Sequence, residues 1–175
     1  KLCMGRIVQY GYTGEVDIEW GAQNSADAEK MAHIMATQTL IWETVVGERD
    51  SNFNHVDTGS YDAVNDRVSK SHPLYSQYIS YYNSMVSNVQ KHSKVPSFFA
   101  KSTSKAQDIE LEWNGTNYST TLTDTNNVLG NYSFTASESG INFSVSGNKL
   151  TITATKAPTS KVSITATKNG SVRKG

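Results

Sequence analysis

The chain has 175 residues, and its 16 Lys and Arg side chains balance 16 Asp and Glu, so the formal net charge is zero. This length suits one domain or two small ones, and the neutral charge argues against nucleic acid or an anionic membrane as the main partner. The sequence also lacks an apolar run near the ~20 residues of a membrane span. Because only 18% of the residues are charged while Ser, Thr and Asn abound, the composition favours an extracellular protein.

Helical periodicity dominates the first half of the chain. Apolar residues at three- and four-residue spacing predict a helix over residues 25–46, capped by Asn24 or Ser25 and stopped at Gly47. A second helix is predicted over residues 73–92, starting at Pro73, with a short helix over 61–69 before it. Residues 2–10 fit a helix or a strand equally well. The expected buried stripe of the first helix is Ala28, Met31, Ala32, Met35, Thr39 and Trp42, and that of the second is Tyr75, Ile79, Tyr82, Val86 and Val89.

A period of two replaces the helical pattern from Gln107 onward. Ile109, Leu111 and Trp113 alternate with polar residues, and the turn signals Asn114-Gly115 and Gly147-Asn148 predict hairpins. The predicted strands are residues 109–113, 118–122, 132–134, 141–145, 150–154 and 162–166. We therefore expect an α+β fold, in which a helical subdomain (residues 1–94) is followed by a linker (95–105), a small antiparallel β-sandwich (106–168) and a tail (169–175).

The side chains that usually carry chemistry are sparse. Cys3 is the single cysteine, which excludes an internal disulfide and a cysteine-rich zinc site, and the four histidines lack the spacing of metal ligands. We expect neither a metal nor a cofactor. Thr37 and Gln38 are polar residues in the middle of an otherwise apolar helix, where an unpaired buried polar group costs about 1–3 kcal/mol. Spacing alone favours Thr37 bonding to its own helix and Gln38 facing water.

The stretch TQTLIWE at residues 37–43 is the most specific pattern in the chain. It resembles the TQxA-type motif of the thioester domains of Gram-positive surface adhesins, with Leu40 where many members have alanine. GRIVQYGY at residues 5–12 is similar to the segment ending in Gly-Tyr that precedes this motif in the family. WNG at 113–115 and LTDTN at 122–126 resemble the β-region of clostridial-type members, so the resemblance spans residues 5–167.

The resemblance implies a thioester between a cysteine and a glutamine side chain, which a lysine amine of a host or other extracellular protein attacks. The glutamine would be Gln107, because residues 106–109 match the first four positions of the family's apolar-Gln-polar-apolar-apolar segment, whereas Glu110 departs at the fifth. Thr37, Gln38, Trp42 and Glu43 would support the site as a polar anchor and an aromatic wall. Each thioester reacts once, so the protein would not be a turnover enzyme.

Two alternatives exist for the cysteine that would form this thioester. Cys3, in Leu2-Cys3-Met4, fits the family's pattern of leucine, cysteine and an apolar residue. The family's cysteine usually stands much further before the Gly-Tyr segment, whereas Cys3 is only eight residues before Gly11. Either Cys3 supplies the thiol of a shortened domain, or the thiol lies upstream and Cys3 is a small apolar residue. We expect the chain to be part of a longer cell-wall-anchored protein, present as a monomeric domain at the bacterial surface.

Two other functions compete with covalent adhesion. The first is a non-covalent binding module or a stalk, in which the fold has lost its bond and the β-part is an Ig-like spacer. The second is a cysteine enzyme such as an acyltransferase, with Cys3 as the nucleophile and a histidine as the base. The enzyme hypothesis requires a histidine within hydrogen-bonding reach of the Cys3 sulfur.

Overall fold

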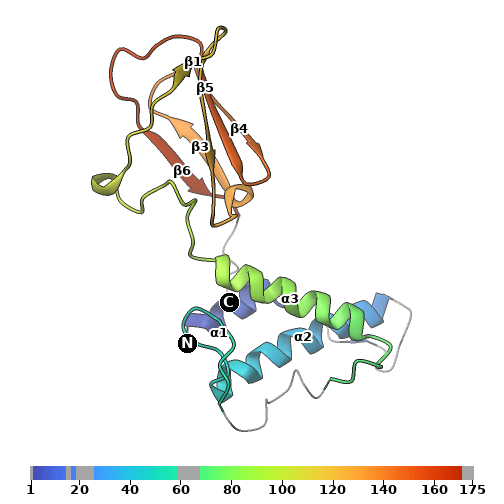
Figure 1. Cartoon of the computed structure of the whole chain (residues 1–175). Helices are drawn as coiled ribbons and strands as arrows, with labels where there is room; N and C mark the ends of the chain where they lie inside the picture. The colour runs from blue at the N-terminus through green and yellow to red at the C-terminus, as the bar shows by residue number, and fades with distance from the viewer. Residues whose placement is uncertain (1, 15–16, 19–25, 59–67, 171–175) are drawn as a thin grey trace. The chain divides into compact units, whose positions relative to one another are not determined.

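A computed structural model describes residues 2–14, 17–18, 26–58 and 68–170 of the chain (Figure 1). The chain divides into two compact units, residues 1–92 and residues 93–175. The first contains helices α1 (Leu2–Tyr10), α2 (Ala26–Val46) and α3 (Tyr75–Lys91), and the second contains antiparallel strands. The predicted α+β fold is thereby confirmed. The predicted caps Asn24 and Ser25 lie outside the described residues. So does most of the predicted short helix over 61–69.

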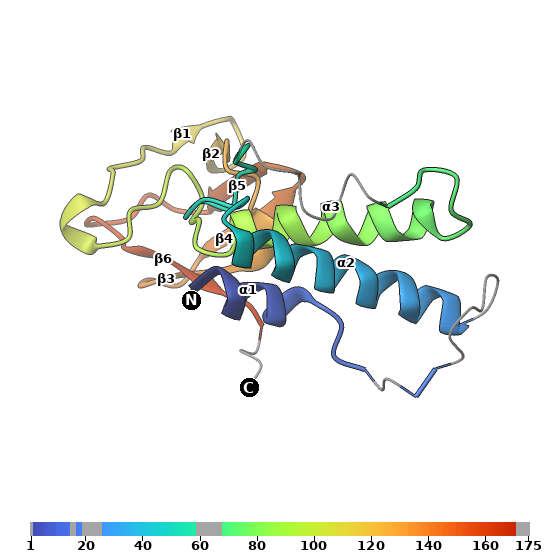
Figure 2. The ribbon, with the colours of Figure 1, turned by 90° about the horizontal axis from the view of Figure 1, so that it is seen from below.

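The helical unit is built on contacts between all three pairs of helices, which lie side by side in Figure 2. The segment that fitted either helix or strand is helical, since α1 buries Ile7 completely against α2 and α3. Gly47, at φ +89°, follows the last residue of α2, as its stop signal predicts. The core of this unit comprises Ile7, Ala32, Ala36, Leu40, Phe53, Tyr78, Tyr82, Met85 and Val89.

The buried face of α2 differs from the predicted stripe at its C-terminal end. Trp42 is 50% exposed, whereas Glu43, the next residue, is 1% exposed. Residues 42 and 43 lie three and four positions after Thr39, so the helical spacing allows either one to be buried. The prediction chose Trp42 because tryptophan is the more hydrophobic of the two. The prediction that Trp42 is buried was wrong because Glu43 has partners in the core. On α3 a similar shift places Tyr78 and Met85 in the core, with Ile79 and Val86 packed at its margin.

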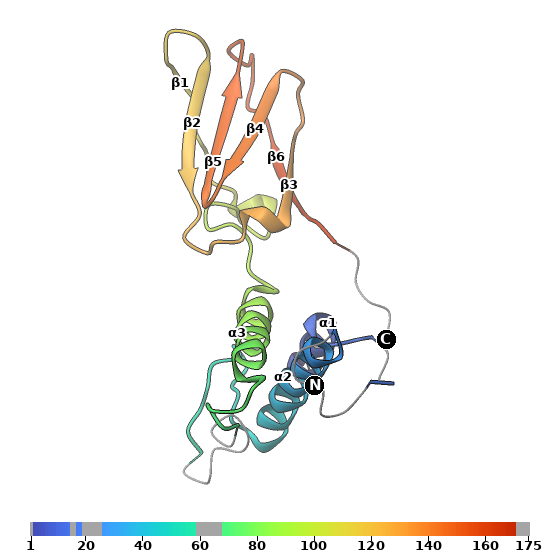
Figure 3. The ribbon, with the colours of Figure 1, turned by 90° about the vertical axis from the view of Figure 1, so that its right-hand side faces the viewer.

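The β-unit consists of two sheets around a small apolar core. Four strands form one sheet in the order β1 (Glu112–Trp113), β2 (Tyr118–Thr123), β5 (Lys149–Ala154) and β4 (Ile141–Ser146), which can be followed from left to right in Figure 3. The second sheet pairs β3 (Tyr132–Ala136) with β6 (Ile164–Lys168). Leu129, Leu150 and Ile152 are buried between them. Ser146 pairs with Lys149 across a two-residue turn in which Gly147 has φ +59°, so the Gly-Asn signal marks a tight hairpin.

The segment before β1 is anchored to the β-unit. Phe98 and Phe99 pack on its core, and residues Thr103–Lys105 form a turn of 3₁₀ helix. Asp124 is fully buried, and its carboxylate accepts hydrogen bonds from the backbone N–H groups of Ser97, Asn126 and Val128 at 2.8, 3.0 and 2.7 Å. This aspartate therefore ties the segment entering the sandwich to the loop between β2 and β3.

Candidate functional site

Two motifs that are separate in the sequence meet at Thr37. The Thr37 Oγ1 donates a hydrogen bond to the carbonyl of His33 one turn earlier, at 2.8 Å, and accepts one from the backbone N–H of Tyr12 at 3.0 Å. Gly11 lies against the same side chain. A Cβ on Gly11 would be 2.7 Å from the Thr37 Cγ2 and 2.8 Å from the carbonyl oxygen of Ile7. The segment containing Gly11 and Tyr12 therefore hydrogen-bonds to Thr37 and packs closely against its side chain.

Replacing Gly11 by alanine is expected to lower the free energy of unfolding by about 1–3 kcal/mol, because the Ile7 carbonyl belongs to the α1 backbone and has little room to shift. Gly5→Ala is the matched control. Gly5 lies within α1, the helix that ends just before Gly11, and has nothing within 4 Å of its Cβ position, so alanine there should stabilise by about 0.5–1 kcal/mol. Thermal unfolding monitored by circular dichroism measures both changes. Equal effects at the two glycines would contradict the close packing.

The next residues of the motif face outward. Gln38 and Trp42 are exposed one turn apart on α2, and Val45 beyond them is 63% exposed. Their spacing puts these three side chains on one face of the helix. They lie on the surface of α2 and do not form the expected aromatic wall around an enclosed cavity.

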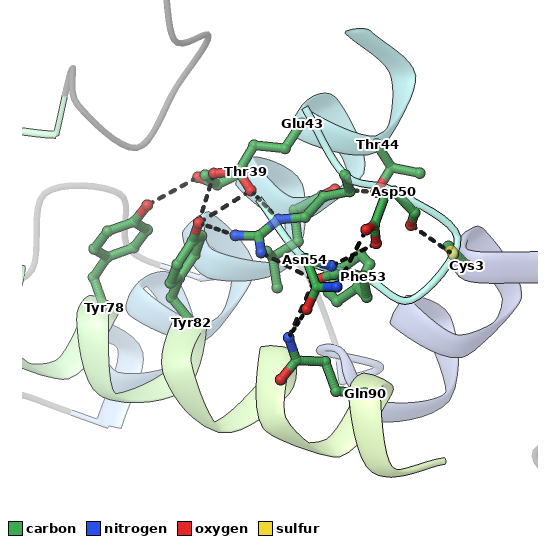
Figure 4. A network of polar contacts seen from close by, with 12 residues as sticks. Cys3, Thr39, Glu43, Thr44, Asp50, Phe53, Asn54, Tyr78, Tyr82 and Gln90 are labelled. Carbon is green, nitrogen blue, oxygen red and sulfur yellow. Dashed lines mark hydrogen bonds and ion pairs between the residues drawn. The ribbon is translucent and has the colours of Figure 1, made fainter. Parts of the chain in front are cut away.

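Glu43 is the charged centre of the helical core (Figure 4). The Arg49 Nε donates to the Glu43 Oε2 at 2.8 Å, and the Tyr82 hydroxyl donates to the Glu43 Oε1 at 2.7 Å. The side chains of this ion pair are only 5% and 1% exposed. Burial, reinforced by the hydrogen bond and charge of Glu43, raises the pKa of Tyr82 well above its ordinary value. The phenol therefore remains a proton donor at any physiological pH.

Arg49 also shapes the loop that follows α2. Its Nη1 donates to the carbonyl of Phe53 at 3.1 Å, and its guanidinium lies over the Phe53 ring, 5.1 Å from the centroid. Phe53 is buried with φ +65°, a conformation that costs a non-glycine residue energy, so the surrounding contacts must hold it in place. The Asp50 carboxylate accepts the N–H groups of Asn52 and Asn54, both at 2.8 Å. Arg49 thus holds Phe53 of this loop, and Asp50 holds the backbone of Asn52 and Asn54.

Cys3 lies on α1 against this loop. Its side chain is half-buried at the margin of the helical core, and its sulfur is 3.8 Å from the carbonyl oxygen of Asp50 and 3.9 Å from that of Ser51. A thiol with these neighbours can donate only weak hydrogen bonds. Within the described residues both hydrogen-bond contacts of the sulfur are with carbonyl oxygens, and neither is with the histidine that the enzyme hypothesis needs.

Gln107 belongs to the other unit. Its side chain is exposed in the segment that leads into β1. The next residue, Asp108, forms an exposed ion pair with Lys161 at 2.6 Å. An amide in this position is accessible to a nucleophile, while Cys3 presents a partly shielded thiol in the helical unit.

Arg49 was missed by the sequence analysis, and Tyr82 was predicted to be buried but not to bond to Glu43. The available signal was Glu43 itself, a carboxylate four residues after the buried Thr39 on an apolar helix. Among the described residues, no group of three His, Cys, Asp or Glu side chains is arranged to hold a metal ion. In the same parts of the chain, no helix has the length and hydrophobicity needed to cross a membrane.

Comparison of the chain with protein families, with characterised proteins and with solved structures found no match. A functional hypothesis therefore depends on the residues themselves and on the contacts they make.

Proposed function

We propose that this chain is a ligand-binding part of a bacterial cell-surface adhesin of the thioester-domain type. The observation that carries the proposal is the fit of Gly11 and Tyr12 to Thr37. The segments 5–12 and 37–43, which occur in the same order as the motifs of the family, are in direct contact. This contact gives a physical reason for Gly11 and Thr37 to occur in the same chain. The neutral, hydroxyl- and amide-rich sequence suits an extracellular location.

In the covalent form of this function, the Cys3 thiolate attacks the side-chain carbonyl carbon of Gln107. The C–N bond breaks, ammonia leaves with the thiol proton, and a thioester remains. A lysine amine of the ligand then attacks the thioester carbonyl, so that an amide forms and the thiol is released. Each protein molecule joins one ligand molecule, and the resulting amide resists dissociation under force.

Intact-mass spectrometry of the purified chain tests the bond directly. The thioester is expected to lower the mass by about 17 Da relative to the sequence, and methylamine should then add about 31 Da. Cys3→Ala and Gln107→Asn should each abolish both changes, apart from the mass of the substitution. A wild-type mass equal to the sequence mass, unaffected by methylamine, would show that these two residues form no thioester.

Non-covalent binding is the second candidate, and the surroundings of Cys3 favour it. The Cys3 side chain packs against the helical core, as a small apolar residue would, and its thiol makes only weak hydrogen bonds, to the carbonyls of residues 50 and 51. In that form the exposed face of α2, with Gln38 and Trp42, is available to a ligand. A chain that lacks the mass change but still binds its ligand reversibly would identify this form.

A further inference from the structure

An aromatic pair lies at one end of the four-stranded sheet. Trp113 on β1 is directly opposite Tyr118 on β2, and their ring centroids are 5.1 Å apart with the planes tilted by 58°. Directly opposite residues of paired strands project to the same face of a sheet. Tyr118 is in turn opposite Ala154 of β5, which is 2% exposed, so both rings project from the face that carries the core. Trp113 is nevertheless 56% exposed, so the core does not cover this end of the face.

A hollow of about 310 Å³, a volume typical of small-molecule sites, adjoins the same row of residues. Its lining comes from residues 138–141, where β4 begins, and from residues 154–158, where β5 ends. Ile141 pairs with Ala154, and Ala154 pairs with Tyr118, so the hollow and the aromatic pair share one end of the sheet, the upper end in Figure 3. Neighbouring strands are about 4.8 Å apart, which places β1 and β4 about 14 Å apart across the row. A ligand longer than a single ring can therefore reach both.

The polar groups of this hollow are complementary to hydroxyl groups. Glu138 and Lys156 both line it, and among the described residues neither side chain has an ion-pair partner. The carboxylate can therefore accept hydrogen bonds from a ligand, and the ammonium group can donate them to ligand oxygens. Ser139 and Thr155 add hydroxyl groups to the lining. Because the two charges cancel, the hollow suits an uncharged ligand better than an ion.

We propose that this end of the β-unit binds a neutral oligosaccharide, with one sugar ring stacked on Trp113 and a neighbouring ring in the hollow. A sugar ring has C–H groups on its faces and hydroxyl groups around its rim, so an exposed aromatic face beside separate donors and acceptors matches it. Anionic ligands are disfavoured, because two exposed carboxylates, Glu110 and Glu112, come just before the tryptophan and Glu138 is in the hollow. The site goes beyond the proposed function, since it lies within the β-unit and needs neither residue of the thioester.

NMR titration of the ¹⁵N-labelled full chain tests the site with neutral trisaccharides of glucose, mannose, galactose and N-acetylglucosamine. At least one is expected to bind with a dissociation constant of about 10⁻⁴ to 10⁻³ M. It should shift the indole signal of Trp113 and the backbone amides of residues 139–140 and 155–156. The indole of Trp42, which is 50% exposed in the helical unit, is the internal control and should not shift. The proposal is overturned if none of the four sugars shifts Trp113, or if Trp42 responds equally.

Three substitutions, with matched controls, test which side chains hold the sugar. Trp113→Ala should weaken binding at least about tenfold, whereas Trp113→Phe keeps an aromatic face and should weaken it less. Glu138→Gln and Lys156→Gln should each weaken binding about three- to tenfold, because each removes a charged partner of the hydroxyl groups. Glu110→Gln and Lys149→Gln make the same chemical changes outside the hollow and should bind as the wild type does. Lys149 is at the other end of β5 from the hollow.

A uridine trinucleotide tests nucleic acid, another ligand that stacks on tryptophan. It should bind more weakly than the sugar, because its phosphates meet the carboxylates around Trp113. The cross-peak of the buried Ile152 verifies that the β-unit of each variant is folded. A trinucleotide that binds more tightly than every sugar overturns the proposal, and so do site variants that bind sugar as well as their controls. The mass measurement is separate: a missing mass change counts against the thioester alone, and missing sugar shifts count against this site alone.

Discussion

Replacing Arg49 by methionine is expected to lower the free energy of unfolding of the helical unit by about 3–5 kcal/mol, the largest single effect that this structure predicts. The substitution leaves the Glu43 carboxylate at 1% exposure without its cation. It also removes the hydrogen bond that holds the Phe53 carbonyl, so the strained turn at φ +65° loses a restraint. The Tyr82 hydroxyl alone cannot compensate a buried negative charge.

A double-mutant cycle separates the ion pair from the packing around it. Glu43→Leu with Arg49→Met removes both charges, so the pair should cost less than Arg49→Met alone, with a coupling energy of about 2 kcal/mol or more. Urea titration followed by the NMR cross-peak of Leu40, a buried residue of α2, reports on this unit. Lys30→Met is the control, since Lys30 and Asp27 form a partly exposed pair at 3.3 Å on α2, and its loss should change stability by less than about 0.5 kcal/mol. Additive single effects would contradict a coupled buried pair.

The sequence predicts best the features that depend on neighbouring residues. The Asn-Gly and Gly-Asn turns fixed the hairpin positions because residues with φ above zero are needed there, and Gly115 and Gly147 have φ of +98° and +59°. The first strand is shorter than predicted. Leu111 contributes to the apolar core, but ladder pairing with β2 begins only at Glu112. The alternation of apolar and polar residues predicts which side chains are buried, but it does not predict where hydrogen bonding to the neighbouring strand begins.

The candidate site was less predictable, because its contacts join distant parts of the chain. Thr37 bonds to its own helix, which spacing alone favours, but its second bond, to Tyr12, spans 25 residues. The burial of Glu43 depends on Arg49 six residues later and on Tyr82 from another helix. Without these partners a carboxylate belongs on the surface, so periodicity and polarity together placed Trp42 in the core instead. In the folded chain Glu43 is buried with its partners and Trp42 is exposed, the reverse of this expectation.

Replacing Asp124 by asparagine is expected to destabilise the β-unit by about 2–3 kcal/mol at pH 7. Burial alone would raise the pKa of Asp124, but the N–H groups of Val128, Ser97 and Asn126 outweigh it and hold the pKa below its ordinary value of 3.8. Asparagine keeps the shape but puts an NH₂ group against one or more of these donors. It also removes the charge that strengthens each hydrogen bond.

The same substitution should change how stability depends on pH. Above about pH 5 the carboxyl is ionised in both the folded and the unfolded chain, so the whole contribution of the hydrogen bonds is present. As the pH falls through 3.8 the unfolded chain takes up a proton while folded Asp124 remains ionised, and stability decreases until the lower folded pKa is passed. Asp124→Asn should therefore lose more stability at pH 7 than at pH 3. Asp108→Asn, in an exposed pair with Lys161, should change stability by less than about 0.5 kcal/mol.

Urea titrations at pH 7, 5, 4 and 3, followed by the NMR cross-peak of the buried Ile152, measure this difference in the β-unit alone. The wild type and Asp124→Asn should converge as the pH falls, because protonation of Asp124 removes the same charge that the substitution removes. A gap between the two proteins that stays constant from pH 7 to pH 3 would contradict this account. The cost of the substitution would then come from the shape of the loop alone, and not from the carboxylate charge that binds residues 97, 126 and 128 together.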